Sequence, residues 1–481
     1  MNHEPIRSFD RDRPDLVAAR RWFTLALAVL ICAGVFALAV VIGRMPPFDR
    51  YVTDPLFFKR CLVAHVNLAL VAWFYSFVVA LLFLLPSRRP CGPLARRSAP
   101  IGAAGVALML IGAAHADGAP MLSNYIPTID NLLFPLGQLV FGFGVLAAIL
   151  DLRLLPGGEH EDGPVAIPEA SRVGLRATAA ALLLAAVTFL TTWLVRMPGL
   201  PADVAHDFLV WGLGHVLQLV STAALVTVWM LLLAPVLGGP PVSRRAAGPL
   251  FLALLLPWTI APIFALQGAD SLAYRHGFTQ LMRWCLFPVE SVFLVLCLSA
   301  VARAWRSGRI GAATFRDSRF SAFLVSVALT VLGFGLGAAI RGSNTMVPAH
   351  YHAAVGAVTV AFMAAAYVLL PAFGIAVPRG WAARAATWQS ALYGLGMFVF
   401  AAGFATAGAR GMGRKLYGAE QSARGFAESV GLGLMGIGGL VAIAGGVLFL
   451  VIVSAALTSA NRTGRAVATI ETSGRLPHEA R

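Results

Sequence analysis

The sequence predicts an all-α protein, a polytopic bundle of about twelve transmembrane helices. Of its 481 residues, 58% are hydrophobic and 12% are charged, whereas a soluble domain carries about 25% charged residues. The mean hydropathy is +0.78. The apolar runs are each long enough to cross a hydrocarbon core, which takes about 20 helical residues. The composition therefore predicts an integral membrane protein.

The apolar runs give the expected spans in chain order. They cover about residues 19–44, 54–86, 98–116, 130–152, 173–196, 204–236, 248–268, 276–304, 319–341, 347–376, 383–406 and 428–458. We expect one transmembrane domain over residues 19–458, a polar head at residues 1–18 and a polar tail at residues 459–481. The head runs directly into the first span, which indicates an uncleaved first helix.

The formal charge of +15 does not indicate a nucleic-acid partner. Most of the basic residues gather in alternate short connections, as the positive-inside rule requires. This pattern predicts a bacterial-type inner (cell) membrane protein with both termini in the cytoplasm. Two connections on the expected outer side, residues 44–60 and 410–424, nevertheless carry four basic residues each. Charge on that side often has a structural or ligand partner.

Seven histidines lie near the expected outer ends of their spans. They are His115, His206 and His276, together with the four that we take as one functional group, His65, His215, His350 and His352. Any one of them could be an interfacial imidazole, but ionisable groups in lipid usually mark function. Residues 350 and 352 point about 200° apart on a helix, so they face opposite sides. Imidazole binds haem iron and copper. His65 with His352 suits a low-spin haem, and His350 alone suits an open one.

The motif A-H-Y-H at residues 349–352 resembles the tenth-helix motif of catalytic subunit I in the heme-copper oxidase superfamily. That superfamily includes terminal oxidases and nitric oxide reductases, and the similarity covers nearly the whole chain in the number and order of spans. The resemblance implies that His350 binds the high-spin haem, and that His352 and His65 bind the low-spin haem. It implies that His215 binds a second metal, copper or non-haem iron.

A second motif, G-M-G-R-K at residues 411–415, is similar to the family's G-M-P-R-R. The resemblance implies that Arg414 and Lys415 meet haem propionates. A plain interfacial basic pair is the alternative interpretation.

The family's seventh helix normally ends in a His-His pair that completes the second metal site. No His-His occurs in this chain, and the pair would fall near Gln267. One histidine alone would hold copper weakly. Three interpretations stay open: an altered site that uses Gln267, Asp270, His276 or His206, no second metal, or completion by a partner.

Glu290 and Arg283 lie in the same expected span, seven residues and so two helical turns apart. An intramembrane carboxyl is a functional candidate by default. Glu290 is therefore a candidate catalytic residue for proton transfer. A buried Arg283–Glu290 ion pair is the alternative.

These features predict a respiratory membrane oxidoreductase with two haems, expected to be of the b type. Electrons would pass from the low-spin haem to the open haem, which would reduce oxygen or nitric oxide. The five cysteines form no C-x-x-C-H motif or cluster, so we expect a donor subunit, a soluble cytochrome c or a cupredoxin. The alternatives are a non-catalytic dihaem electron carrier or gas sensor without a second metal, and a transporter that uses the histidines as a proton relay.

Overall fold

The computed structural model describes residues 13–51, 53–87, 90–115, 117–151, 166–417, 420 and 425–473, with side chains up to residue 458. Residues 1–12 of the expected head and 474–481 of the expected tail lie outside this part. Within it, eleven helices are long and apolar enough to cross a membrane. The fourth expected span, at residues 130–152, forms a shorter apolar helix of 17 residues, α5 (Leu133–Ile149). The expected bundle of about twelve helices is confirmed.

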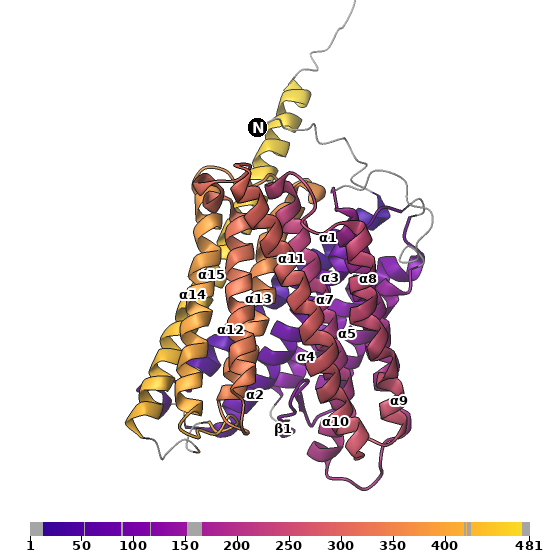
Figure 1. Ribbon diagram of the computed structural model, residues 1–481, viewed down its shortest axis with the longest axis vertical. Coiled ribbons are helices and arrows are strands. Elements are labelled where there is room, and N and C mark those ends of the chain that lie inside the picture. The colour runs from indigo at the N-terminus through magenta and orange to yellow at the C-terminus, as the bar shows by residue number, and fades with distance from the viewer. Residues whose placement is uncertain are drawn as a thin grey trace, which may run out of the picture.

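The helices run side by side along one long direction (Figure 1). In chain order the longer ones are α1 (Pro14–Ile42), α2 (Pro55–Val66), α3 (Trp73–Phe83), α4 (Pro93–Ala114), α5, α6 (Glu169–Leu194), α7 (Ala202–Leu237), α8 (Arg244–Leu255), α9 (Ala261–Leu266), α10 (Leu272–Leu281), α11 (Phe287–Arg306), α12 (Ser318–Ala338), α13 (Met346–Leu369), α14 (Trp381–Gly408) and α15 (Phe426–Ser473). Short π or 3₁₀ turns join α2 to α3, α8 to α9 and α10 to α11, so each of these pairs forms one span. Helix α15 continues 15 residues past the expected end of its span at residue 458.

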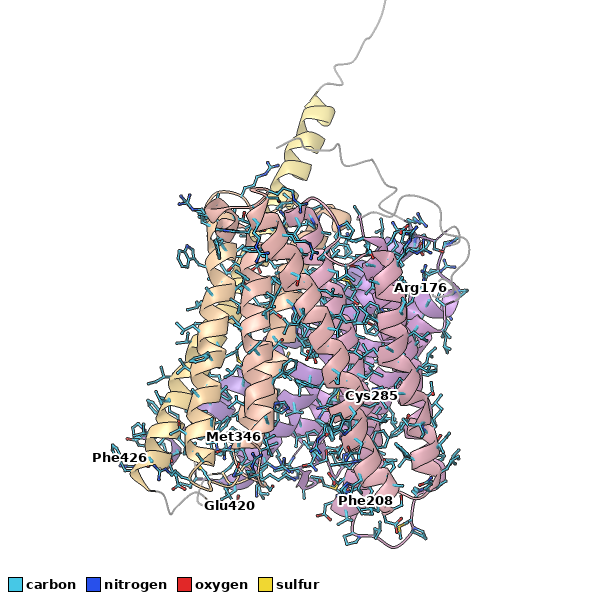
Figure 2. The ribbon with its side chains drawn as sticks, in the orientation of Figure 1. Arg176, Phe208, Cys285, Met346, Glu420 and Phe426 are labelled. Atoms are coloured by element: carbon cyan, nitrogen blue, oxygen red, sulfur yellow. The ribbon has the colours of Figure 1, made fainter. Side chains whose placement is uncertain are left out.

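A small antiparallel pair of strands, β1 (Pro120–Met121) and β2 (Thr128–Ile129), lies in the connection between α4 and α5. We call the end of the bundle that carries it the strand end. The starts of α7, α13 and α15 lie there, as Phe208, Met346 and Phe426 show (Figure 2). The start of α1 and the far end of α15 lie at the opposite end (Figure 1). The beginning of the first helix and the end of the last one therefore share one side of the bundle.

Two spans form the centre of the bundle. In both α7 and the α13 span, 83% of the most apolar window is buried inside the protein, against 22% in α1. Helix α7 packs against α13, and α13 packs against α12 and α14. Because lipid tails are as apolar as leucine, such helices associate by close packing rather than by the hydrophobic effect. Residues on α7 and α13 are thus held by neighbours on several sides.

Glycines let α14 and α15 approach until their backbones touch. A Cβ atom added at Gly403 would lie 2.2 Å from the backbone nitrogen of Met435, and one at Gly438 would lie 2.2 Å from that of Phe400. Small residues at such crossings are typical of membrane helices. A larger side chain would have to separate the two helices.

We predict that Gly403→Ala lowers the free energy of unfolding by about 1–3 kcal/mol, because overpacking at a backbone contact forces the helices apart. Gly433→Ala is the matched control, since its Cβ would meet nothing within 4 Å and alanine favours a helix. Thermal unfolding in detergent measures both. Equal stabilities of the two variants would contradict this account of the contact.

Candidate functional site

His65 and His352 form one pair at the strand end. His65 lies on α2 and its Nδ1 is 3.0 Å from the carbonyl oxygen of Ala33 on α1. His352 lies on α13 and its Nδ1 is 2.7 Å from the carbonyl oxygen of Pro348. The two imidazoles are close enough to interact electrostatically. Sequence reasoning paired these two residues, and the fold brings them together.

His350 is directed to a different neighbour. Its Nδ1 is 2.7 Å from the carbonyl oxygen of Gly333 on α12. A Cβ atom added at Gly337 would lie 2.9 Å from both Nδ1 and Cε1 of this imidazole, so the ring lies directly on α12. The ring of His352, by contrast, packs 4.6 Å from that of Phe400 on α14. The two histidines thus face different helices, as their spacing predicts.

A shared hydrogen-bond pattern fixes the tautomer of all three imidazoles. A carbonyl oxygen only accepts, so Nδ1 must carry the proton in each ring. In a neutral imidazole Nε2 then presents a lone pair. Among the described residues, no protein group donates a hydrogen bond to Nε2 of His65, His350 or His352. This arrangement, with one ring nitrogen held by a carbonyl and the other free, is the one that metal ligation requires.

A buried arginine lies beside this pair. Arg44 is 1% exposed, and it donates hydrogen bonds to the carbonyl oxygens of Gly413, at 3.0 Å, and Arg414, at 3.2 Å. Its guanidinium lies 5.0 Å from the ring centroid of Phe404 and 4.7 Å from that of Tyr417. In the described part of the chain Arg44 forms no ion pair with a carboxylate, although it interacts electrostatically with His352. Burying an uncompensated charge is costly, so the site favours an anion.

Sequence reasoning did not select Arg44. The signal that could have found it was the excess of basic residues at 44–60, on the side where the positive-inside rule predicts few. Two atoms strengthen the case for an anion. The Nε atoms of Arg44 and Arg414 are buried and have no hydrogen-bond partner in the described structure.

The two basic residues selected from the sequence bind the connection that carries the strands. Arg414 donates from Nη2 to the side-chain oxygen of Asn124 at 2.5 Å. Lys415 donates to the carbonyl oxygen of Leu122. Burial, followed by the charge of Arg414, lowers the pKa of Lys415. Arg414 and Lys415 therefore lie between the α14–α15 connection and the loop at residues 120–129.

His215, on α7, is in a different situation from the other three histidines. Its Nδ1 is 2.8 Å from the carbonyl oxygen of Trp211, and its Nε2 is 2.9 Å from the hydroxyl of Tyr125. Rings of Tyr125, Trp211 and Phe278 surround it, with centroids 4.5, 4.7 and 5.3 Å away. Sequence reasoning missed Tyr125, because a single tyrosine in a connection carries no recognisable motif.

The other candidate ligands for a second metal do not gather around His215. Nε2 of His206 is 2.7 Å from the carbonyl oxygen of Ile126. Gln267, Asp270 and His276 are exposed. Within the described residues, no three side chains of histidine, cysteine, aspartate or glutamate lie together in a way that could hold a metal ion.

Glu290 lies on α11 and is 6% exposed, and no ion pair or hydrogen bond of its carboxyl group is found within the described residues. Arg283 is exposed, and the alternative of an Arg283–Glu290 pair is not formed. Arg283 lies within a π-helical turn at Met282–Leu286, and Glu290 follows that turn. Such a turn adds a residue and rotates the helix beyond it, so two residues seven apart no longer share a face. Glu290 is left as a buried carboxyl in the bundle.

We predict that Arg44→Gln loosens the α14–α15 connection, because the variant loses the hydrogen bonds of the guanidinium to the carbonyl oxygens of Gly413 and Arg414 and its contacts with Phe404 and Tyr417. The free energy of unfolding should fall by about 1–3 kcal/mol. Trypsin cleavage after Arg414 and Lys415 in detergent should speed up. Arg50→Gln is the control, because Arg50 is an exposed arginine in the same α1–α2 connection as Arg44. Equal rates of cleavage in the two variants would contradict the prediction.

Comparisons with known proteins give relatives in sequence and a solved structure with a similar fold. No family model matches the chain. An uncharacterized protein of Rickettsia prowazekii (strain Madrid E) is 23% identical over 495 residues, covering 90% of this chain and 94% of that protein. An uncharacterized protein of Aquifex aeolicus (strain VF5) is 28% identical over 358 residues, covering 73% of this chain and 84% of that protein. The cryo-EM structure of a heme-copper terminal oxidase dimer is similar with a TM-score of 0.69 and 14% identity, covering 93% of this chain and 84% of the solved one. The chain is a multi-pass membrane protein with the fold of a heme-copper oxidase.

Proposed function

We propose that this protein is a haem-containing membrane oxidoreductase with two haems of the b type. A low-spin haem would be held between His65 and His352, and an open haem would be held by His350. The observation that carries the proposal is the shared pattern of these three imidazoles. Each has Nδ1 on a backbone carbonyl and a free lone pair on Nε2. Bound haem would supply electron transfer and a place for a small diatomic molecule, oxygen or nitric oxide.

The residues around the His65–His352 pair fit a dianionic group. Arg44 brings a buried positive charge with a free Nε, and Arg414 brings a second free Nε. Lys415 adds a third cation at the same end of the bundle. Haem propionates are carboxylates, and a charge-assisted hydrogen bond is roughly twice as strong as a neutral one. Arg44, Arg414 and Lys415 would thus orient the low-spin haem with its propionates toward the strand end.

The protein's own groups would supply two further functions, the orientation of the imidazoles and the transfer of protons. Hydrogen bonds to Ala33, Gly333 and Pro348 keep the three imidazoles in the metal-binding tautomer. Glu290 is the candidate proton carrier, since it is a buried carboxyl with no ion pair within the described residues, and a carboxyl group can both hold and release a proton. We expect it to serve the His350 side. Substrate reduction consumes protons as well as electrons, which is why such a carrier is needed.

A second candidate function is a non-catalytic dihaem protein for electron transfer or gas sensing. One observation favours it: a copper or non-haem iron site with several ligands is not found among the described residues. Purified protein that holds two haems and turns over neither oxygen nor nitric oxide would support this second function. Turnover of either gas would support the oxidoreductase.

The strand end is the side that we assign to the outer face of a bacterial-type inner membrane, with both termini in the cytoplasm. The distribution of basic residues along the chain supports this orientation. An electron donor would then dock at the strand end, near the proposed propionates. A donor subunit, a soluble cytochrome c and a cupredoxin all have the required chemistry.

We predict that His65→Ala and His352→Ala each abolish the low-spin signal in the reduced-minus-oxidised spectrum and leave the high-spin signal of the His350 haem. His276→Ala, at an exposed histidine near the same end, should leave both signals unchanged. Purified wild-type protein without any haem spectrum would refute the proposal and favour a transporter. Unchanged spectra in both variants would refute the ligand assignment.

We also predict that Gly337→Ala perturbs the open haem alone. The new Cβ would lie 2.9 Å from Nδ1 of His350, so the ring would have to move and its hydrogen bond to Gly333 would break. Loss of a group that orients a metal ligand typically costs about 10- to 100-fold in metal affinity. Gly335→Ala, whose Cβ would meet nothing within 4 Å, is the control on the same helix. A shift in the low-spin signal instead of the high-spin signal would contradict the assignment of His350.

A further inference from the structure

We infer that His215 binds no metal and is a positioning residue that holds the hydroxyl of Tyr125, so a metal-free tyrosine–histidine pair stands where the resemblance implies a second metal. The inference deepens the proposed function and rests on it for the number of haem irons. The pair itself rests on contacts of the protein alone.

The first argument concerns the ring nitrogens of His215. Nδ1 lies 2.8 Å from the carbonyl oxygen of Trp211 and must donate to it, so the neutral ring has its lone pair on Nε2. The hydroxyl of Tyr125 lies 2.9 Å from Nε2 and donates to that lone pair. Burial is the main reason that the pKa of Tyr125 is raised, so the phenol keeps its proton. Both ring nitrogens are therefore engaged, unlike those of His65, His350 and His352.

The second argument concerns how Tyr125 is held in place. A Cβ atom added at Gly214 would lie 2.3 Å from both Cβ and Cγ of Tyr125, so a glycine makes room for the tyrosine directly beside His215. The neighbours of Tyr125 are also fixed. The backbone N–H of Asn124 donates to Asp207 at 3.3 Å, and the carbonyl oxygen of Ile126 lies 2.7 Å from His206. Three contacts with α7 therefore hold three successive residues of the loop.

The far side of the loop is held by the side-chain amides of Asn67 and Gln138. Asn67, which is 1% exposed, donates to the carbonyl oxygen of Pro127 at 2.8 Å. Gln138 donates to the same oxygen at 3.0 Å and to the side-chain oxygen of Asn67 at 2.7 Å. A carbonyl that accepts from two side-chain amides, one of them buried, is costly to release. Withdrawal of Tyr125 to admit a metal would therefore strain contacts on both sides of the loop.

The third argument concerns what else faces the site. Trp211 and Gln218 lie four residues before and three residues after His215, so all three share one face of α7. Nε1 of Trp211 and Oε1 of Gln218 are buried without a hydrogen-bond partner in the described structure. An indole N–H is a donor and repels a cation, and a single amide oxygen does not complete a transition-metal site. The chemistry of the donor set does not fit copper or non-haem iron.

The first test is a metal count. Protein produced with copper and iron supplied in excess should contain two irons per chain, equal to its haem content, and no third metal ion. The His215→Ala and Tyr125→Phe variants should give the same count. A third metal ion in the wild type that is lost in His215→Ala would overturn the inference.

The second test measures the hydrogen-bonded pair without reference to any metal. Amide hydrogen exchange at residues 120–129 should speed up about tenfold in His215→Ala and in Tyr125→Phe, because each removes one of the bonds that hold the loop. His215→Gln, which keeps an acceptor near the position of Nε2, should restore most of the protection. His276→Ala should leave exchange at the wild-type rate.

Exchange that stays at the wild-type rate in His215→Ala and in Tyr125→Phe would overturn the positioning role. Protein with no haem iron but with the expected exchange pattern would refute the proposed function and leave the tyrosine–histidine pair supported. The two failures are therefore distinguishable. Should His215→Ala fail to fold, Tyr125→Phe and His215→Gln give the same contrast.

Discussion

The hydrogen bond from histidine Nδ1 to a backbone carbonyl is the interaction on which the rest of the site depends. Inside a bilayer no water satisfies an imidazole, so each ring nitrogen needs a protein group or a ligand. Each of the four imidazoles donates a hydrogen bond from Nδ1 to one backbone carbonyl oxygen. The four acceptors are the carbonyls of Ala33, Trp211, Gly333 and Pro348. They thereby fix where the remaining lone pair points. The chemistry of the site then depends on the group that meets that lone pair.

Helix packing makes two of these bonds possible, those of His65 and His350, while His352 and His215 bond to carbonyls of their own helices. His350 and His352 lie near the start of α13, which is almost wholly surrounded by other helices. On one side α12 contributes the carbonyl of Gly333, and on the other α14 contributes the rings that enclose His352. Glycines at the contacts allow helices to come close enough for a ring to reach a backbone atom of its neighbour. Close packing between helices therefore fixes which ring nitrogen carries the proton in His65 and His350.

Much of the fold could be predicted from the sequence. The lengths of the apolar runs predict the transmembrane spans, and the arginines in the connections predict their orientation. The opposite faces of His350 and His352 were also predictable, since they follow from helical geometry alone. Tyr125 and Arg44 were not selected, because their roles arise from contacts with residues about 90 and 370 positions away. The alternative of an Arg283–Glu290 pair is not formed, and the π-helical turn of five residues that contains Arg283 leaves no clear mark on composition. Local periodicity predicts elements, and it does not predict which loop folds back onto which helix.

The loop between α4 and α5 has a consequence of a mechanical kind. Asn124 and Tyr125 are adjacent in the chain, yet Asn124 is held by Arg414 from the α14–α15 connection while Tyr125 is held by His215 on α7. One peptide unit therefore spans two parts of the molecule that are nearly 200 residues apart in sequence. The loop therefore links the α14–α15 connection to α7, so a displacement of one of these parts is transmitted to the other through adjacent residues.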